Sequence, residues 1–202
     1  MYCVGLTGTI ASGKSLASNY FKSQGIDVLN ADTIAKELTQ KNTPALTEIS
    51  RHFGKDFLTK KGDLDRRKLR SHIIHHPEER RWLEELLHPM IRQHIESAIK
   101  QCTSPYCIIE IPLLLDRTPY PYLQRVLLIT AEPEQQIQRL MTRDECSETE
   151  ARALLAQQES NNSRAEIADD IILNTGSIET LNDKLSQLHH NYLRAQAKNA
   201  PA

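Results

Sequence analysis

Apolar residues fall along this chain in two alternating patterns, which predict strands alternating with helices. Short apolar runs, typical of strands buried on both faces, occur at residues 2–6, 26–29, 106–111, 125–130 and 170–173. Segments with apolar residues at helical spacing follow these runs: one ending at Gly25, then 33–40, 133–143, 147–158, and a last one reaching about residue 194. The order predicts an α/β fold with a parallel sheet of these five strands, covered by helices on both faces.

The alternation is interrupted between the second and third predicted strands. From about residue 42 to 101 the chain is rich in charged residues and histidine, and its apolar residues fall at helical spacing, with Pro77 and Pro89 as expected helix breaks. This composition predicts a helical insertion at 32–104 in a core of 1–31 and 105–202. Elsewhere, Ser147 and Glu150 predict a capping box, and the last dozen residues are expected to fray.

The turn after the first predicted strand carries a phosphate-binding motif. Residues 8–15 read Gly, four residues, Gly-Lys-Ser, and the motif lies between a strand and a helix, as it does in proteins that bind nucleoside triphosphates. Gly8 and Gly13 permit backbone conformations that a Cβ would hinder. Backbone amides from Ala11 to Leu16, including those of Ser12 and Gly13, can then face phosphate oxygens. Lys14 adds a full charge, and the Ser15 hydroxyl can ligate Mg²⁺.

The composition of the chain limits the binding partners and the location that we expect. The formal net charge of −1 over 202 residues predicts no general attraction to nucleic acid or to an anionic membrane. No apolar run approaches the roughly 20 residues that span a bilayer, and the first strand runs directly into the phosphate loop, so we expect no signal segment. Four cysteines without paired metal spacing favour a cytoplasmic location.

Two carboxylates follow predicted strands and are candidates for chemistry. Asp32 comes just after the second strand, where it could accept a proton from an acceptor hydroxyl or simply cap the next helix. Glu110 ends the third strand, where it could hold the Mg²⁺ shell through water or be a solvated strand end. The sequence pattern leaves both alternatives open.

Arginines supply the remaining candidates. Arg139 and Arg143 lie four residues apart on one predicted helix face, before a helix break at 144–147, and could close over transferring phosphates or form a solvated surface. Arg164 is a third candidate. Arg66 begins a basic cluster at 66–70 that could meet an anionic acceptor or be a solvated helix face.

Histidines in the insertion carry weaker signals. His72, His75 and His76 lack matching carboxylate or cysteine spacing, so we interpret them as surface residues. His88, before Pro89, could contact a ligand or close its helix.

With these residues in view, nearly the whole chain resembles the dephospho-coenzyme A kinase family. The resemblance rests on the order and spacing of several segments: Val4–Gly8 with Gly13–Ser15, Asn30–Asp32, Leu86–Pro89, Pro112–Asp116, Arg139 with Arg143, Gln158, Arg164, residues 168–169, and Asn174–Gly176. Two departures stand out. Thr9 and Ala11 make the loop less rich in glycine, and Asn30 replaces the first Asp of the family's Asp-Ala-Asp motif, so that carboxylate is absent here.

The resemblance implies transfer of the ATP γ-phosphoryl group, with Mg²⁺, to the ribose 3′-hydroxyl of dephospho-coenzyme A. It implies a three-layer fold of the phosphate-loop kinase type, with a helical lid at about 139–165 and the insertion as acceptor-binding domain. It implies that Asp32 is the catalytic base and that Lys14, Arg139 and Arg143 are further catalytic residues. It also implies that Arg66 and His88 contact the acceptor. We expect a monomer or weak homo-oligomer.

Three other functions remain as alternatives. A nucleoside monophosphate or shikimate kinase would share the loop and the lid arginines without the Asn-Ala-Asp and Leu-His-Pro segments. A GTP-binding switch would need Asp-x-x-Gly and Asn-Lys-x-Asp motifs, which this sequence lacks. A non-catalytic ATP-dependent module would not need a carboxylate at Asp32 to activate a hydroxyl.

Overall fold

The computed structural model describes residues 1–158 and 161–199. The chain divides into two compact units. One comprises Met1–Asn30 and the chain from Ile99 onward, and the other is Ala31–Ala98. The boundaries expected from the sequence, after residues 31 and 104, differ from these by one and six residues. Each unit is described by itself.

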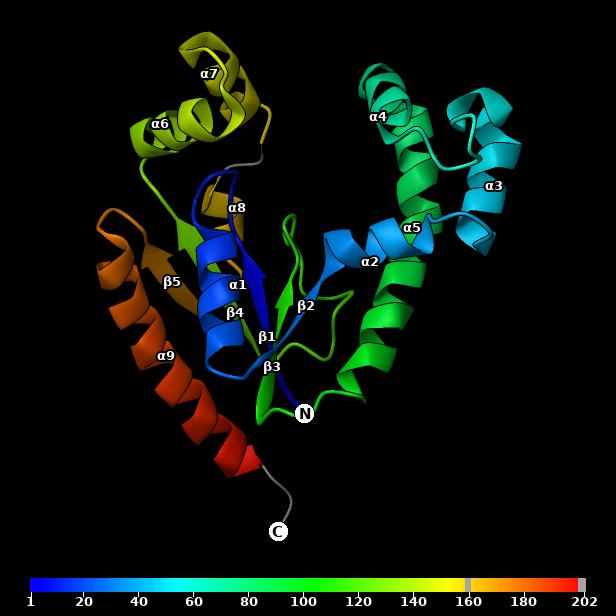
Figure 1. The fold of residues 1–202 in the computed structure, drawn as a ribbon. Helices are drawn as coiled ribbons and strands as arrows, with labels where there is room; N and C mark the ends of the chain where they lie inside the picture. Colours follow the sequence, from blue (N-terminus) through cyan, green and yellow to red (C-terminus); the bar gives the residue numbers. More distant parts are fainter. Residues whose placement is uncertain (159–160, 200–202) are drawn as a thin grey trace. The chain divides into compact units, whose positions relative to one another are not determined.

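The first unit is built on a five-stranded parallel sheet with strand order β2-β3-β1-β4-β5 (Figure 1). The strands are β1 Tyr2–Thr7, β2 Asp27–Asn30, β3 Tyr106–Glu110, β4 Arg125–Thr130 and β5 Asp170–Leu173. All five predicted strands are confirmed. Since β1 is central and pairs with β3 and β4, the chain that follows it leaves the sheet at the middle of its carboxyl edge.

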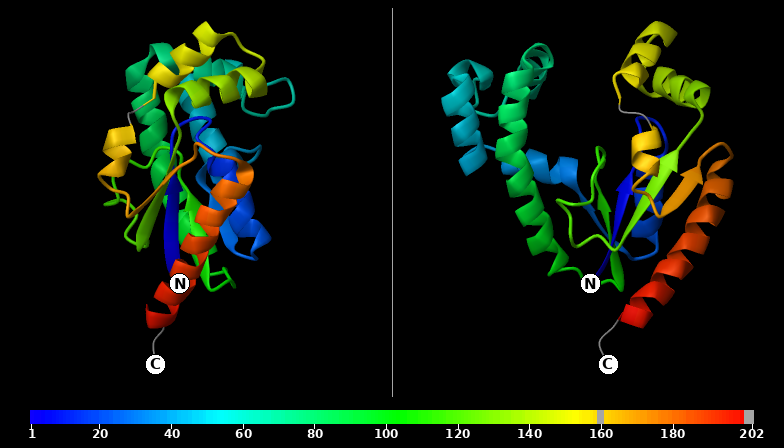
Figure 2. Two further views of the ribbon diagram at one scale, coloured as in Figure 1. Left: turned by 90° about the vertical axis from the view of Figure 1, so that its left-hand side faces the viewer. Right: turned by 180° about the vertical axis from the view of Figure 1, so that it is seen from behind.

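Helices lie on both sides of this sheet. The helices α1, Lys14–Ser23, and α9, Ile178–Asn199, pack together on one face, whereas the short α8, Asn161–Ala165, lies against β4 on the other (Figure 2). Phe21 of α1 is fully buried and makes ring contacts with Tyr106 and Tyr192. Burying one such aromatic side chain contributes about 2–3 kcal/mol, so this cluster fixes α1, and with it the phosphate loop, onto the sheet.

Two further helices of this unit overlap the predicted lid at about 139–165, which begins in the middle of the first of them. The helix α6, Pro133–Asp144, begins with proline in its first turn, and α7, Glu148–Ala156, begins at the predicted capping box, in which Ser147 and Glu150 bond to each other's backbone N–H. The two helices pack together through Ile137, Leu140 and Ala151. The short α8 was not predicted, because its residues Asn-Asn-Ser-Arg-Ala form no apolar pattern.

The second unit is helical, as the charge-rich composition predicted. It contains α2 Ala31–Leu38, α3 Pro44–Phe53, the 3₁₀ turn η1 Lys55–Phe57, α4 Arg66–His75 and α5 Pro77–Ile99. Its own hydrophobic core is centred on Leu46, Ile49, Leu64, Leu69 and Leu83.

Two expectations about helix ends are wrong. Pro89 lies inside α5 and does not end it. A proline within a helix costs about 3 kcal/mol, and here buried residues on either side of it, Leu83 and Ile95, hold the helix together by packing. The C-terminal helix α9 continues to Asn199, so the fraying expected from about residue 191 is not seen up to that point, and residues 200–202 lie outside the described chain.

Candidate active site

The phosphate-binding motif forms a tight loop between β1 and α1. Gly8 has φ 152° and Gly13 has φ 110°, and each is packed too closely for a side chain. A Cβ on Gly8 would lie 2.2 Å from the carbonyl oxygen of Ile129, and one on Gly13 would lie 2.4 Å from Nδ2 of Asn174. Both positions therefore require glycine.

The phosphate loop combines backbone hydrogen-bond donors with positive charge. Gly13 precedes α1 without any side-chain cap, and no acidic residue lies in the first turn of the helix. Backbone amides at such a helix start suit a phosphate group. The Lys14 Nζ donates to the carbonyls of Gly8 at 2.7 Å and Thr9 at 2.9 Å, so the ammonium lies over the loop. Ser15 and Leu16 follow on the exposed side of the first turn.

A buried hydroxyl inside the loop fits a bound phosphate. Ser12 is fully buried, and its Oγ has no hydrogen-bond partner among the described residues. The same oxygen lies 2.9 Å from the position a Cβ would take on Gly8, so it faces the inside of the loop. A buried hydroxyl without a partner is unfavourable by about 1–3 kcal/mol, and a phosphate oxygen would supply the missing acceptor.

The outer side of the loop is held by amide side chains from distant parts of the first unit. Gln136 of α6 is 2 % exposed and donates to Thr9 Oγ1 at 2.7 Å and to the Ile10 carbonyl at 2.6 Å. Oε1 of Gln158 accepts from the Ile10 amide at 2.8 Å, and Asn174 donates to the Ser12 carbonyl at 2.9 Å. Gln136 carries no motif that predicts this role, although it lies one turn before Arg139 and therefore on the same helix face.

The two candidate lid arginines have different surroundings. Arg139 donates to the carbonyls of Ala11 at 3.2 Å and Asn174 at 3.0 Å, so it joins the loop to the turn after β5. Arg143 is 57 % exposed and forms a two-point ion pair with its neighbour Asp144. This hydrogen-bonded pair raises the pKa of Arg143 and lowers that of Asp144. Arg164 lies in α8 and is 2 % exposed, so its side chain is part of the interior.

The substitution of alanine for glycine in the loop is accommodated by an unusual backbone conformation. Ala11 has φ 56°, in the left-handed region, which costs a residue with a Cβ roughly 1–2 kcal/mol. Its side chain and that of Ile10 pack against the α6–α7 pair. The loop tip is thus tied to these helices by apolar contact as well as by hydrogen bonds.

A carboxylate at the end of β3 and a hydroxyl of α1 are joined by a buried hydrogen bond. Glu110 ends β3, pairs in register with Leu6 and Asn30, and is 8 % exposed. Its Oε2 accepts from Ser18 Oγ at 2.8 Å, and Ser18 lies three residues beyond Ser15, on the same face of α1. One carboxylate and one hydroxyl suit Mg²⁺, which takes its other ligands from water and phosphates. No group of three His, Cys, Asp or Glu side chains that could hold a metal occurs among the described residues.

The other predicted site residues belong to the second unit. Asp32 is an exposed residue in the first turn of α2, which begins at Ala31, directly after β2. The alternative role as helix cap does not match this position, because a cap precedes the first turn. Arg66 begins α4 and donates to the Lys36 carbonyl and to Thr39 Oγ1. His88 is exposed in the middle of α5, so it does not close that helix.

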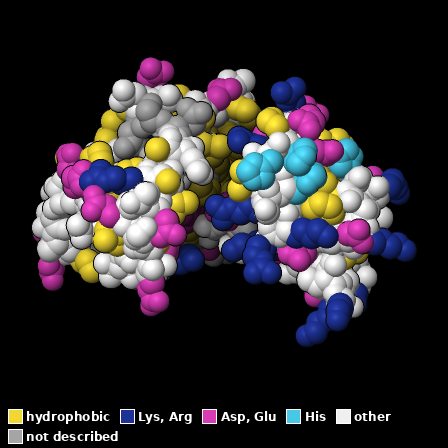
Figure 3. All heavy atoms as spheres, turned by 90° about the horizontal axis from the view of Figure 1, so that it is seen from above, with side chains coloured by type: hydrophobic (Ala, Val, Ile, Leu, Met, Phe, Trp, Pro, Cys, Tyr) yellow, Lys and Arg dark blue, Asp and Glu magenta, His cyan; other side chains and the backbone are white. Residues whose placement is uncertain are grey.

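Histidines gather on one face of the second unit, among hydrophobic, acidic and basic side chains (Figure 3). His72 and His76 stack with their ring centroids 4.1 Å apart, beside Phe57. The arrangement is open to solvent and brings no metal-binding set together among the residues described.

A parallel sheet whose central strand leads into this loop and the start of a helix defines a phosphate-loop nucleotide-binding protein. The dephospho-CoA kinase family model matches residues 2–180. The dephospho-CoA kinase of Legionella pneumophila (strain Paris) is 50 % identical over 194 residues, which are 96 % of each chain. That of Escherichia coli (strain K12) is 40 % identical over 193 residues, 96 % of this chain and 94 % of the other. The chain belongs to the dephospho-CoA kinase family and is an enzyme.

Solved structures of related proteins have the same fold. Dephospho-CoA kinase from Campylobacter jejuni superposes with a TM-score of 0.70 at 27 % identity, covering 96 % of this chain and 98 % of the other. A shikimate kinase from Acinetobacter baumannii, covering 95 % and 94 %, has a TM-score of 0.53 at 16 % identity, a likeness of fold alone. The predicted fold class is confirmed.

Proposed function

We propose that this enzyme transfers the γ-phosphoryl group of ATP to the 3′-hydroxyl of dephospho-coenzyme A, giving coenzyme A and ADP, the last step of coenzyme A synthesis. The observation that carries the proposal is the phosphate loop, with its two constrained glycines, its lysine and an uncapped helix start, in a chain of this family. Phosphoryl transfer depends chiefly on positioning and on stabilising charge, and these groups serve both.

On the donor side, the amides of residues 11–16 would bind the phosphates of ATP, and Lys14 would balance the charge that develops on the γ-phosphoryl group. Ser12 Oγ would give its hydrogen to a phosphate oxygen. Arg139 holds the loop through the Ala11 carbonyl. Arg143, exposed at the end of α6, would close toward the phosphates. To do so, its guanidinium group would give up its ion pair with Asp144 and form one with a phosphate group instead.

On the acceptor side, Asp32 would accept the proton of the attacking hydroxyl. Its support is its place in the first turn after β2, at the carboxyl end of the strand next to β3. A carboxylate in this position orients the hydroxyl for in-line attack and takes up its proton as the new bond forms. Arg66 and His88, in the helical insertion, would contact the acceptor.

Mg²⁺ is part of the proposal, with the Ser15 hydroxyl and the Glu110 carboxylate as its protein partners. When bound, the ion would neutralise charge on the phosphates. Ser18 keeps Glu110 in place by donating to one of its oxygens and leaves the other available.

The proposal includes where the enzyme works and which partners it needs. None of the four cysteines, all of which the structure describes, forms a disulfide, which suits a reducing cytoplasm. No helix in residues 1–158 or 161–199 is long and apolar enough to cross a bilayer. We expect an enzyme that needs neither nucleic acid nor membrane and is a monomer or weak homo-oligomer.

The test is acceptor choice. The purified protein with Mg²⁺ and ATP should be offered dephospho-coenzyme A, AMP and shikimate separately, and kcat/KM should be measured for each. We expect a preference for dephospho-coenzyme A of at least roughly a thousandfold, because the other two lack most of its binding groups. Comparable or better use of AMP or shikimate would overturn the proposal.

A further inference from the structure

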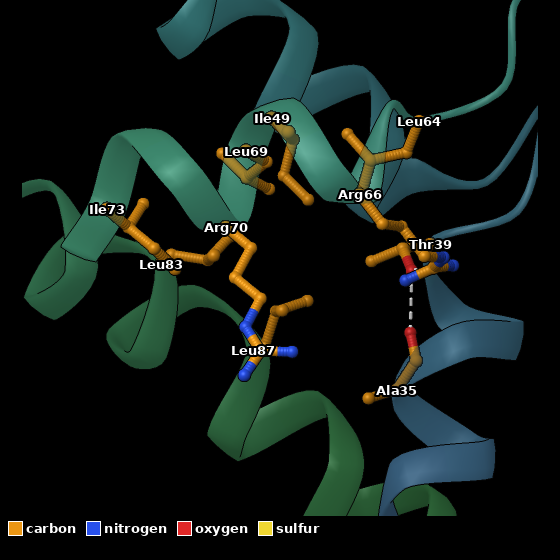
Figure 4. Close-up of a pocket in the computed structure, with 10 residues that line it drawn as sticks. All are labelled: Ala35, Thr39, Ile49, Leu64, Arg66, Leu69, Arg70, Ile73, Leu83 and Leu87. Atoms are coloured by element: carbon orange, nitrogen blue, oxygen red, sulfur yellow. Dashed lines mark hydrogen bonds between the residues drawn. The ribbon is translucent and has the colours of Figure 1, made fainter. Parts of the chain in front are cut away.

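A small cavity lies within the helical insertion, enclosed by α2, α3, α4 and α5 (Figure 4). It has a volume of about 150 Å³, and aliphatic side chains form most of its wall, including Ile49, Leu69, Leu83 and Leu87. No aromatic ring lines it. Thr39 is the one hydroxyl in its wall, and this hydroxyl already donates to the Ala35 carbonyl at 2.7 Å.

Two arginines, one helical turn apart on α4, accompany this aliphatic wall. Arg66 is held in place, because one of its terminal nitrogens donates both to the Lys36 carbonyl at 2.9 Å and to Thr39 Oγ1 at 2.7 Å. Arg70 extends beside Leu87 (Figure 4) and makes no ion pair with any carboxylate among the described residues. Like charges four residues apart repel each other, so this pair favours an anionic ligand that can contact both guanidinium groups.

A pair of arginines next to a mostly aliphatic cavity suits a ligand in which a strong anion directly adjoins a branched apolar group. Dephospho-coenzyme A has such a junction. One methylene group joins its diphosphate to a quaternary carbon that bears two methyl groups, at the start of the pantetheine arm. The adenine end suits the cavity less well, because a base needs hydrogen-bond partners or a stacking ring, and the only hydroxyl here is already used.

Resting on the proposed function, we propose that this cavity takes the two methyl groups of the acceptor's pantetheine arm, while Arg70, supported by Arg66, pairs with the diphosphate. Arg70 and the cavity then determine specificity. They distinguish dephospho-coenzyme A from adenosine and other acceptors that offer the same ribose hydroxyl but lack this junction.

The charge part of the proposal is tested with Arg70→Ala. Its matched control is Arg67→Ala, an exposed arginine of the same helix that does not line the cavity. Loss of a charge-assisted contact should raise the Kd and KM for dephospho-coenzyme A about tenfold or more, with the KM for ATP and the kcat at saturation unchanged. With adenosine as acceptor the effect should fall below about twofold. Equal effects of Arg70→Ala and Arg67→Ala would overturn the assignment.

The apolar part is tested with an acceptor analogue in which hydrogens replace the two methyl groups. Burial of two methyl groups is worth roughly a tenfold change in affinity, so the wild-type Kd should rise by about that factor. In Leu83→Phe, which fills the cavity, the two acceptors should bind equally. The same tenfold ratio in this variant would overturn the cavity assignment.

The outcomes separate this inference from the function itself. If Leu83→Phe does not fold, the analogue can still be compared on wild type and on the exposed Arg70→Ala variant, where the methyl effect should persist while overall affinity falls. Wild-type protein that phosphorylates dephospho-coenzyme A but shows no loss with the analogue overturns the inference alone. Wild-type protein that folds and binds ATP but leaves dephospho-coenzyme A unmodified overturns the proposed function.

Discussion

The side-chain amide of Gln136 donates to the hydroxyl of Thr9 across 2.7 Å, in a contact between buried groups that joins α6 to the phosphate loop. Its nitrogen also donates to the next carbonyl along the loop, that of Ile10, at 2.6 Å. Gln136 therefore uses both amide hydrogens on two consecutive loop residues. The position of the loop tip depends on α6 as well as on the two glycines that shape it.

Gln136→Ala should loosen this connection. Two buried loop groups would lose their donor, which destabilises the fold by about 1–3 kcal/mol, and the KM for ATP should rise because the loop is less well ordered. Thermal unfolding and steady-state kinetics measure the two effects. Gln138→Ala, an exposed position on the same helix, is the control and should leave both quantities near wild type; if the two variants behaved alike, Gln136 would not hold the loop.

The two lid arginines should respond differently to removal. Arg139→Ala removes donors to the Ala11 and Asn174 carbonyls, so both the melting temperature and kcat should fall. Arg143→Ala breaks only an exposed ion pair with Asp144, worth at most about 1 kcal/mol, so stability should hardly change while kcat falls by roughly 10- to 1000-fold. An unchanged kcat in Arg143→Ala would exclude this arginine from phosphoryl transfer.

Gly13→Ala tests the close packing of the loop. The new Cβ would meet Nδ2 of Asn174 at 2.4 Å while the backbone keeps φ 110°, so we expect a loss of at least ~2 kcal/mol in the free energy of unfolding and no measurable ATP binding. Gly25→Ala is the matched control, because it has φ 73° with nothing within 4 Å and should cost only about 1 kcal/mol. Calorimetric titration with ATP distinguishes them, and wild-type affinity in Gly13→Ala would contradict the loop geometry.

The start of β2 should give the enzyme a pH-dependent stability. Asp27 Oδ2 accepts from the backbone amides of Ser104 at 3.0 Å and Thr103 at 2.8 Å, and these bonds, chiefly that from Ser104, lower the pKa of Asp27. A carboxyl whose pKa is lowered on folding stabilises the protein above its unfolded pKa of about 3.9, and loses this effect as the pH falls through the folded value.

Asp27→Asn should therefore reduce the free energy of unfolding by roughly 1 kcal/mol at pH 7, after allowance for solvent screening. The difference from wild type should shrink below about pH 4. Urea unfolding at the two pH values measures it. Asp183→Asn, on the exposed side of α9, should show no such trend, and a constant difference for Asp27→Asn at both pH values would contradict the linkage.

The strands and the phosphate loop could be predicted because their signals are local. The run Val126–Ile129 is apolar throughout, and Pro133 begins the following helix in the structure as its preference for first-turn positions predicts. Pro89 misled the prediction for the opposite reason. Its helix is maintained by tertiary packing of Leu83 and Ile95, which a local rule does not include.

The contacts that hold the phosphate loop in place could hardly be predicted from the sequence. A glutamine on a helix, such as Gln136, has no local feature that distinguishes a buried donor from a solvated side chain. Its role depends on contacts with Thr9 and Ile10, which lie 127 and 126 positions away from it in the sequence. Arg139 could be selected as a candidate from its spacing with Arg143, yet the spacing suggested equivalent roles, whereas the two side chains have different partners. What Asp32 does stays a prediction.

The most direct test of the account is acceptor-dependent formation of ADP from ATP and Mg²⁺ by the wild-type protein and by Asp32→Asn, with ATP affinity measured separately. The phosphorylated product should be identified by mass and its 3′-position by NMR. We predict that wild type forms ADP only when dephospho-coenzyme A is present, and that Asp32→Asn binds ATP normally but transfers at least about 100-fold more slowly. Asp32→Asn turning over at the wild-type rate, or wild type phosphorylating a hydroxyl other than the 3′-hydroxyl, would contradict it.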